Sequence, residues 1–228
     1  MQLLLINPNT NSAMTHKISV HLDQIARGQL QIISTTASFG SAYISTEASY
    51  AVATHATLDA WTQYANNNND TNHSKQDQNV QCTLIACFGD PGLFALREVS
   101  TAPVTGLAEA SFIEATQYGE FAVVTGGKAW GPMLKRLALS LGYNTNLIAI
   151  HTVDASGAQL AADPIAALEL LANACRTVLA QHPAKAIILG GAGLVGMAQQ
   201  IQPQFEIPII DSVSAGARWA LATLQKNT

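Results

Sequence analysis

The sequence predicts an α/β fold of two pseudo-symmetric lobes, each with a mainly parallel sheet flanked by helices, and an active site in the cleft between them. Two observations lead to this prediction. Short apolar runs alternate with longer amphipathic segments along nearly the whole chain, as in parallel strands joined by helices. In addition, the same series of landmarks occurs twice, which indicates two similar halves.

The first half opens with a buried strand, Leu3–Ile6, and the polar turn Asn7–Asn11. This turn supplies a helix N-cap and several side-chain amides at the carboxyl end of a strand. The helix that follows ends near Gly28 and has one apolar face, made of Met14, Ile18, Leu22 and Ile25. We therefore expect the chain to begin with a strand, a polar turn and a helix, in that order.

A second strand is expected at Leu30–Thr35, then a Gly/Ser loop over 38–46 and a long helix at Glu47–Tyr64. The segment Asn66–Gln81 differs from its surroundings, because it contains a run of four Asn and almost no apolar residues. We interpret it as a solvated insertion in the first lobe.

The segment Thr83–Glu98 is the one around which we expect the site to form. Its apolar strand, Thr83–Ala86, ends on Cys87 and the turn Gly89–Gly92, and a helix starts at Leu93. Ligands of parallel α/β sheets bind at such strand ends. Free N–H groups and a helix terminus there favour a thiolate, so Cys87 is a candidate nucleophile or base with a lowered pKa. The alternative is a small buried apolar side chain.

The rest of the chain continues the alternation. The expected strands are Pro103–Gly106, Phe121–Thr125, Leu147–His151, Ala186–Gly190 and Ile207–Asp211. The expected helices are Leu107–Tyr118, one from Pro132 to Gly142, one that opens at Asp163-Pro164 and carries Cys175 on its apolar side, and Ser212–Gln225.

The internal repeat concerns the turns after two strands. Cys87 is followed sixteen residues later by the Pro-Val-Thr-Gly run at Pro103, and Gly191 is followed seventeen residues later by the Pro-Ile-Ile-Asp run at Pro208. Cys87 and Gly191 are therefore pseudo-equivalent and are expected on opposite walls of one cleft. We divide the chain accordingly, with 1–106 plus 212–228 as lobe 1, including the insertion at about 66–81, and 107–211 as lobe 2.

Composition limits the classes of partner. The net charge is −4, and the sequence has no basic cluster, which argues against nucleic acid. It contains neither a signal peptide nor an apolar run of membrane-spanning length, so we expect no membrane contact and a cytoplasmic location. Only 11% of residues are charged and 48% are hydrophobic. That balance predicts an oligomer interface, and so a homo-oligomer. A small-molecule substrate is expected instead from the strand-end turns that line the cleft.

Cysteine and histidine usage points away from disulfides and metals. Three cysteines in a chain without an export signal are expected to be free thiols. No His/Cys spacing resembles a metal site. His16 and His21 are expected on the surface of the first helix.

A rival motif is the G-x-G-x-x-G run at Gly191–Gly196, with Asp211 twenty residues on. It matches a dinucleotide fingerprint. We rank this hypothesis low, because only a short helix fits before Pro203 and too little chain follows Asp211. The repeat explains the same glycines, whose N–H groups suit an anionic oxygen of any ligand.

Several runs of residues together resemble the hydantoin and allantoin racemases of the aspartate/glutamate racemase superfamily. They are Ile6–Thr10, Cys87–Leu93 with Arg97-Glu98, Pro103-Val104 with Glu109-Ala110, and Leu189–Gly193. The resemblance covers nearly the whole chain outside the Asn-rich insertion. It implies two pseudo-symmetric α/β lobes, no cofactor, and two cysteines that pair across the cleft. One takes the α-proton of a carbon acid and the other returns a proton to the opposite face.

The first of these cysteines matches Cys87, whereas Gly191 stands where the resemblance places the second. Three hypotheses follow for an enzyme: a hydantoin- or allantoin-type racemase impaired at this position, a racemase engineered there, or a single-cysteine decarboxylase or isomerase. A non-catalytic small-molecule binder is a fourth. The expected substrate-binding residues, besides Cys87 and Gly191, are Asn9, Phe88, Gly89, Thr125, Gly126, Ala192 and Gly193. For Asn9 and Thr125 the alternative is ordinary helix capping, and it is favoured for Glu109 and Asp211.

Overall fold

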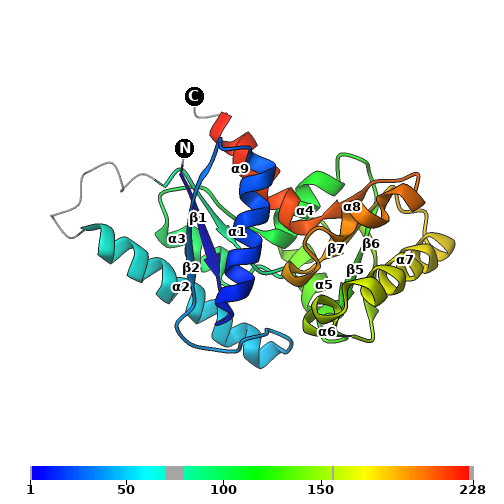
Figure 1. Ribbon diagram of the computed structural model, residues 1–228, viewed down its shortest axis with the longest axis horizontal. Helices are drawn as coiled ribbons and strands as arrows, with labels where there is room; N and C mark the ends of the chain where they lie inside the picture. The colour runs from blue at the N-terminus through cyan, green and yellow to red at the C-terminus, as the bar shows by residue number, and fades with distance from the viewer. Residues whose placement is uncertain (1, 70–79, 156, 226–228) are drawn as a thin grey trace.

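The structure is a computed structural model that describes residues 2–69, 80–155 and 157–225. Two separate four-stranded sheets form two lobes that lie side by side (Figure 1). The first sheet has the order β2-β1-β3-β4 and the second the order β6-β5-β7-β8, and all pairings are parallel. The two sheets thus have equivalent strand orders, which agrees with the two similar halves that the sequence repeat predicts.

The strands are short. They are β1 (Gln2–Asn7), β2 (Gln31–Thr36), β3 (Cys82–Ile85), β4 (Val104–Gly106), β5 (Phe121–Gly126), β6 (Leu147–Val153), β7 (Ala186–Gly190) and β8 (Ile209–Asp211). All eight lie within two residues of the predicted positions at each end. The order of elements in the chain therefore follows the alternation in the sequence.

The helices in the first half of the chain are α1 (Ser12–Ala26), α2 (Glu47–Asn69), α3 (Leu93–Val99) and α4 (Leu107–Ala115). Those that follow are α5 (Trp130–Ser140), α6 (Gly157–Ala162), α7 (Pro164–Gln181), α8 (Met197–Ile201) and α9 (Ser212–Gln225), with 3-10 turns at Ala192–Leu194 and Gln202–Gln204.

Several helices differ from the expectation. α5 runs from Trp130 to Ser140 rather than from Pro132 to Gly142. α2 ends at Asn69 rather than at Tyr64, because no glycine or proline interrupts the first asparagines. α4 ends at Ala115 rather than at Tyr118, and the short helix α6 was not anticipated. Most of the predicted insertion, residues 70–79, lies outside the described residues.

Alternation along the strands builds three apolar layers. Leu3, Leu5 and Leu84 face a central core that also contains residues of β5 and β7. Leu4 and Ile6 face the opposite way, beneath α2 and α3. In the second lobe, a separate core lies under α7 and α8 and includes Leu171 and the buried Cys175. The central core therefore joins the lobes.

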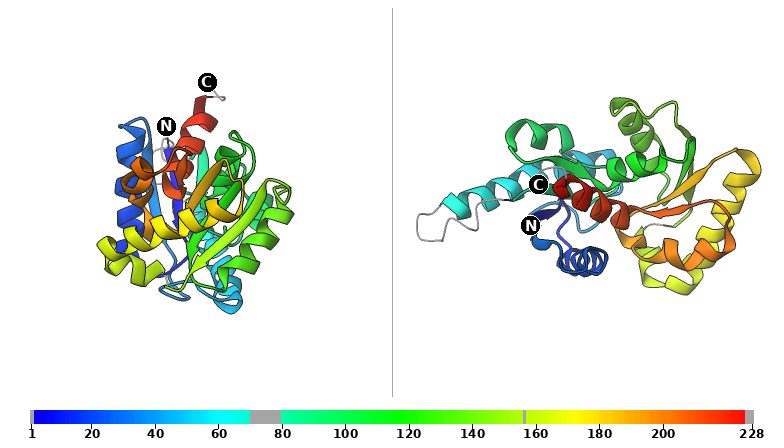
Figure 2. Two further views of the ribbon diagram at one scale, coloured as in Figure 1. Left: turned by 90° about the vertical axis from the view of Figure 1, so that its right-hand side faces the viewer. Right: turned by 90° about the horizontal axis from the view of Figure 1, so that it is seen from above.

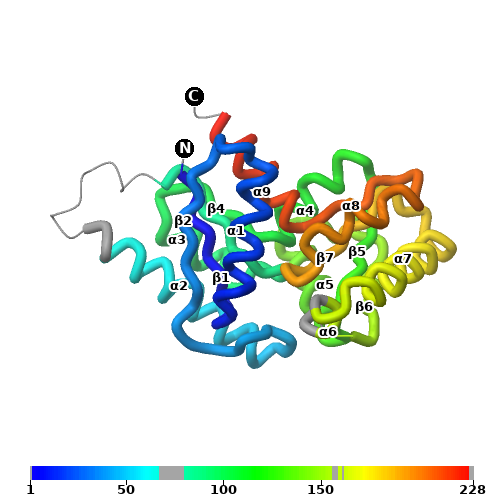
Figure 3. The backbone as a smooth tube through the Cα atoms, in the orientation of Figure 1, coloured from blue at the N-terminus to red at the C-terminus, as the bar shows by residue number. Residues whose placement is uncertain are grey.

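Helices α4 and α9 cross between the lobes. α4 packs against β7, and α9 packs against α1 and β3, although each follows a strand of the other sheet. The tube in Figure 3 and the two further views in Figure 2 show α9 returning beside α1 at the first lobe. The carboxyl ends of β1, β3, β5 and β7 consequently face one cleft.

Within the described part of the chain, none of the helices is both long and apolar enough to cross a bilayer.

Candidate active site

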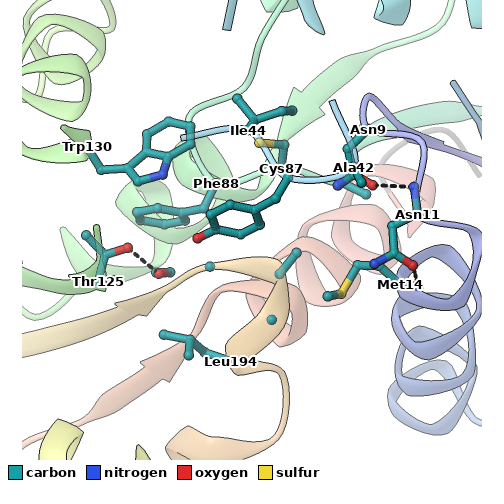
Figure 4. Close-up of a pocket in the computed structure, with 17 residues that line it drawn as sticks. Asn9, Asn11, Met14, Ala42, Ile44, Cys87, Phe88, Thr125, Trp130 and Leu194 are labelled. Carbon is teal, nitrogen blue, oxygen red and sulfur yellow. Dashed lines mark hydrogen bonds between the residues drawn. The ribbon is translucent and has the colours of Figure 1, made fainter. Parts of the chain in front are cut away.

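A cavity of about 310 Å³ lies where the strand ends of both lobes meet. Its lining comes from five strand-end loops, and Figure 4 shows it. The lining residues are Asn9, Asn11, Met14, Ala42, Tyr43, Ile44, Ala86, Cys87, Phe88, Thr125, Gly126, Trp130, Gly190, Gly191, Ala192, Gly193 and Leu194. The structure therefore brings together every predicted site residue except Gly89.

Cys87 lies just beyond the end of β3, and its side chain is buried, with 7% of the residue exposed. Burial, with a smaller contribution from the charge of Asp90, raises the pKa of the thiol. The expectation of a lowered pKa is wrong, because no cationic side chain is among the described lining residues. Cys87 is consequently a neutral thiol at neutral pH, ready to donate a proton.

Asp90 holds the turn that carries Cys87. Its φ of 54° lies in the left-handed region, and its N–H donates to the carbonyl of Cys87 at 3.1 Å. Its carboxylate accepts hydrogen bonds from the N–H groups of Ala108 at 2.9 Å and Glu109 at 2.8 Å, at the start of α4. Burial raises the pKa of Asp90 to about 7. The turn is thus fixed to the neighbouring strand-helix junction.

Gly106 leaves the space that this carboxylate needs. A β-carbon at position 106 would lie 2.2 Å from Cγ of Asp90. In the second lobe the corresponding junction is capped from within, because Oδ1 of Asp211 accepts from the N–H groups of Val213 and Ser214. The equivalent helices α4 and α9 are therefore capped by carboxylates from different positions in the chain. The cap of α4, Asp90, belongs to the turn that carries the thiol, whereas Asp211 directly precedes α9.

Thr125 and Phe88 both contact Gly190 next to the cavity, Thr125 from within the second lobe and Phe88 across from the first. The Thr125 hydroxyl donates to the carbonyl of Gly190 at 2.6 Å. The alternative that Thr125 caps a helix is wrong, since α5 begins after Ala129. Phe88, from the first lobe, lies on Gly190 at the end of β7.

Asn9 belongs to a network in the turn after β1. Its side-chain oxygen accepts from Nδ2 of Asn7 at 3.0 Å and from the N–H of Asn11 at 2.9 Å. Asn11, not Asn9, is the N-cap of α1, with its side chain accepting from Met14. The amide N–H₂ of Asn9 has no partner in the described chain, so it can donate to a ligand in the cavity.

The opposite wall is a 3-10 turn after β7. Gly191 has φ +144°, a backbone conformation that side chains other than glycine rarely adopt. Its N–H donates to Oγ of Ser212 at 3.3 Å. Ala192 and Gly193 open the turn, where the first N–H groups have no partner within it. These groups can bind an anionic oxygen.

Gly89 lies behind the cavity wall, against the ring of Trp130, and its carbonyl accepts from the Tyr50 hydroxyl at 2.9 Å.

Some lining residues were not predicted from the sequence, namely Trp130 and the loop residues Ala42, Tyr43 and Ile44. That loop follows a predicted strand end, which is the signal that could have identified it. Asn11, Met14 and Leu194 were also missed, and they come from the flanking helix starts.

His21 is not the surface residue that we expected. It is half-buried, with Nε2 2.8 Å from Oγ of Ser214 and 4.0 Å from Oδ1 of Asp211. Burial lowers its pKa, while Asp211 acts in the opposite sense. His16 is exposed, as expected. His21 therefore ties α1 to the junction of β8 and α9.

The carboxylates of Glu109 and Asp211 make contacts within the protein. Glu109 is not the helix cap that we expected, because it lies inside α4, whose N-cap is Gly106. It accepts a hydrogen bond from Thr105 at 2.6 Å and pairs with Arg97. Asp211 accepts from three N–H groups, including that of Gly196 at 2.7 Å, and is 4% exposed. It is thus poorly placed to bind a ribose hydroxyl, against the dinucleotide hypothesis. Among the described residues there is no cluster of three metal-ligating side chains.

Comparison with known proteins identifies the family to which this chain belongs. A family model for Asp/Glu/Hydantoin racemase matches residues 3–220. The chain is 31% identical to a hydantoin racemase of Paenarthrobacter aurescens, over 96% of this chain and 89% of the relative. It is 30% identical to a hydantoin racemase of Pseudomonas sp. (strain NS671), over 96% and 84%.

Solved structures of related proteins have a similar fold. An allantoin racemase from Klebsiella pneumoniae superposes with a TM-score of 0.87 at 28% identity, covering 100% of this chain and 89% of that one. A double mutant of arylmalonate decarboxylase superposes with a TM-score of 0.69 at 16% identity, covering 100% and 94%, and so shares the fold.

Proposed function

Since this chain belongs to the Asp/Glu/Hydantoin racemase family, we propose that it racemises a cyclic ureide of the hydantoin or allantoin type without a cofactor. The enzyme is an isomerase of that family. The observation that carries the proposal is the Cys87 thiol, which opens into a cavity whose two walls come from the two lobes.

The geometry gives each part of the reaction a group. The N–H groups at Ala192 and Gly193 and the amide of Asn9 would hold the ureide oxygens and stabilise the enolate that forms when the α-proton leaves. Cys87 would exchange a proton with one face of the α-carbon. Phe88 and Trp130, which line the cavity, would keep water away from the enolate.

A single proton-donating side chain on one face of the substrate also suffices for a decarboxylation, since loss of CO₂ from a disubstituted malonate needs one proton donor. Cys87 is the only thiol among the described lining residues, because Cys82 and Cys175 are each 0% exposed in the cores. This observation makes decarboxylation the second candidate. A binder without turnover is the third.

Proton NMR in D₂O with enantiopure 5-substituted hydantoins, allantoin and aryl-substituted malonates separates these candidates. α-Proton exchange with loss of optical rotation supports a racemase, and CO₂ release from the malonates supports a decarboxylase. Cys87→Ser is expected to abolish either. Ligand binding that survives in Cys87→Ser, with no turnover by the wild type, would leave only the binder.

A further inference from the structure

Trp130 is a buried tryptophan whose indole N–H has no hydrogen-bond partner in the described parts of the chain. The residue is 5% exposed and begins α5 in the second lobe. Its backbone N–H donates to the carbonyl of Gly127 at 3.1 Å, whereas no acceptor among the described residues meets Nε1. A buried indole usually places this N–H on an acceptor. The donor of Trp130 is therefore available to a ligand in the cavity that it lines.

The indole ring is held by contacts on the side away from its nitrogen. A β-carbon at Gly89 would lie 2.3 Å from Cζ3 and 2.9 Å from Cη2 of the ring, so this edge rests on the backbone of the turn that carries the thiol. The ring of Tyr50 meets the indole edge-on, with centroids 6.4 Å apart at 76°. Because Nε1 lies diagonally across the bicyclic ring from Cζ3, it is turned away from Gly89. Figure 4 shows the nitrogen on the edge of the ring that faces Phe88 and the cavity.

Unpartnered donors also lie on the other side of the cavity. The side-chain oxygens of Asn9 and Asn11 accept from the N–H groups of Asn11 and Met14, at 2.9 and 3.0 Å. These contacts orient the two carboxamides, and neither N–H₂ group donates to a described residue. Figure 4 shows both amides on the side of the cavity away from Trp130. The cavity thus presents neutral donors from two directions.

A cyclic ureide suits this distribution of donors. A hydantoin ring carries its two carbonyl oxygens, at C2 and C4, on different sides of the ring, so donors from two directions match it better than a single cluster would. Charge favours the same match, because no cationic side chain is among the described lining residues. Negative charge that develops on a substrate oxygen must then be stabilised by neutral N–H donors.

We propose that the indole N–H of Trp130 donates a hydrogen bond to one carbonyl oxygen of a bound cyclic ureide, while the amide of Asn9 or Asn11 binds the other. This role rests on the proposed racemase function and deepens it. Trp130 is then a substrate-binding residue as well as part of the cavity wall, and it takes no part in moving the proton.

Nuclear magnetic resonance of the indole groups tests the contact directly. The chain has three tryptophans, so labelling with ¹⁵N-indole tryptophan gives three N–H signals, and the one lost in Trp130→Phe belongs to Trp130. The probe is 5,5-dimethylhydantoin, which has no hydrogen at C5 and cannot be racemised. We expect the Trp130 proton to move downfield as the probe binds, while the signals of Trp61 and Trp219 stay in place.

Replacement of the indole nitrogen tests what the contact contributes to turnover. Trp130→β-(3-benzothienyl)alanine, introduced by nonsense suppression, has sulfur in place of the N–H and keeps a bicyclic ring against Gly89. We expect kcat/KM for racemisation of a 5-substituted hydantoin to fall by about 10- to 100-fold, with thermal unfolding unchanged. The same replacement at Trp61, which is half-buried on α2 and outside the cavity lining, is the matched control and should leave kcat/KM unchanged.

A Trp130 signal that does not move downfield as the probe is added, or an unchanged kcat/KM after the replacement at position 130, would overturn the contact. Failure of the proposed function gives a different result. A wild type that binds the probe through Trp130 but exchanges the α-proton of no hydantoin would exclude racemisation and keep the hydrogen bond.

Discussion

The ring of Phe88 lies so close to the α-carbon of Gly190 that a β-carbon at position 190 would be 2.1 Å from Cε1 of the ring. Phe88 follows the thiol in the first lobe, and Gly190 ends β7 in the second. Both line the cavity. The spacing of the two walls therefore depends on the absence of a side chain at one residue.

Gly190→Ala should destabilise the protein by about 1–3 kcal/mol, because the added methyl overlaps a buried ring that has little space to move. Chemical denaturation measures the change. Gly131→Ala is the control, since a β-carbon there meets nothing nearer than 3.8 Å. In Phe88→Ala the same Gly190→Ala change should cost much less, and equal costs in both backgrounds would show that the ring is not the obstacle.

Cys87 should react with iodoacetamide before Cys82 or Cys175, because it alone of the three lines the cavity. Its raised pKa means that the reactive thiolate is scarce at pH 7 and increases with pH. Mass spectrometry of peptides labelled at pH 7 and pH 9.5 measures this. Fast labelling at pH 7, independent of pH, would contradict a neutral thiol.

The buried carboxyl of Asp90 should make stability depend on pH. Its folded pKa of about 7 exceeds the ordinary carboxyl value of 3.8, so the folded state holds the proton more tightly. The contribution to the free energy of unfolding is complete below about pH 4 and is lost as the pH rises toward 7, with a slope approaching about 1.4 kcal/mol per pH unit.

Unfolding of Asp90→Asn over that range should lack this component of the slope. Asp23→Asn, at an exposed position of α1, should keep it. Parallel curves for Asp90→Asn and wild type would show that Asp90 is ionised throughout.

Gly191→Cys should cost about 1–3 kcal/mol of stability, although the nearest atom to an added β-carbon, Cγ of Leu194, is 3.4 Å away. The cost comes from the φ of +144° rather than from a clash. Gly191→Ala should therefore lose a similar amount by denaturation. A stable Gly191→Cys with faster racemisation would mean that this turn adopts an ordinary conformation at little cost.

We also propose that the chain forms a homo-oligomer. The sequence has 11% charged residues, and large apolar side chains are exposed, among them Leu139 at 63% and Ile165 at 83%. Sedimentation velocity should give a mass that is a multiple of 24.0 kDa. A single species at 24.0 kDa at micromolar concentration would disprove self-association.

The sequence predicted the two repeated sheets and most of the cavity, because both depend on local signals. Alternating apolar runs specify strands, and the Gly-rich turns after Ala86 and Gly190 specify where parallel strands end. The resemblance to racemases and the position of Gly191 were likewise readable along the chain.

Only the tertiary structure determines the properties that depend on neighbours distant in sequence. The pKa of Cys87 is raised because the cavity buries it without a cation, which no local pattern reports. Asp90 caps α4 across the turn because Gly106 leaves room, and Tyr43 joins the thiol because two loops converge. Burial and electrostatics are sums over the folded surroundings, so they arise only when the lobes meet.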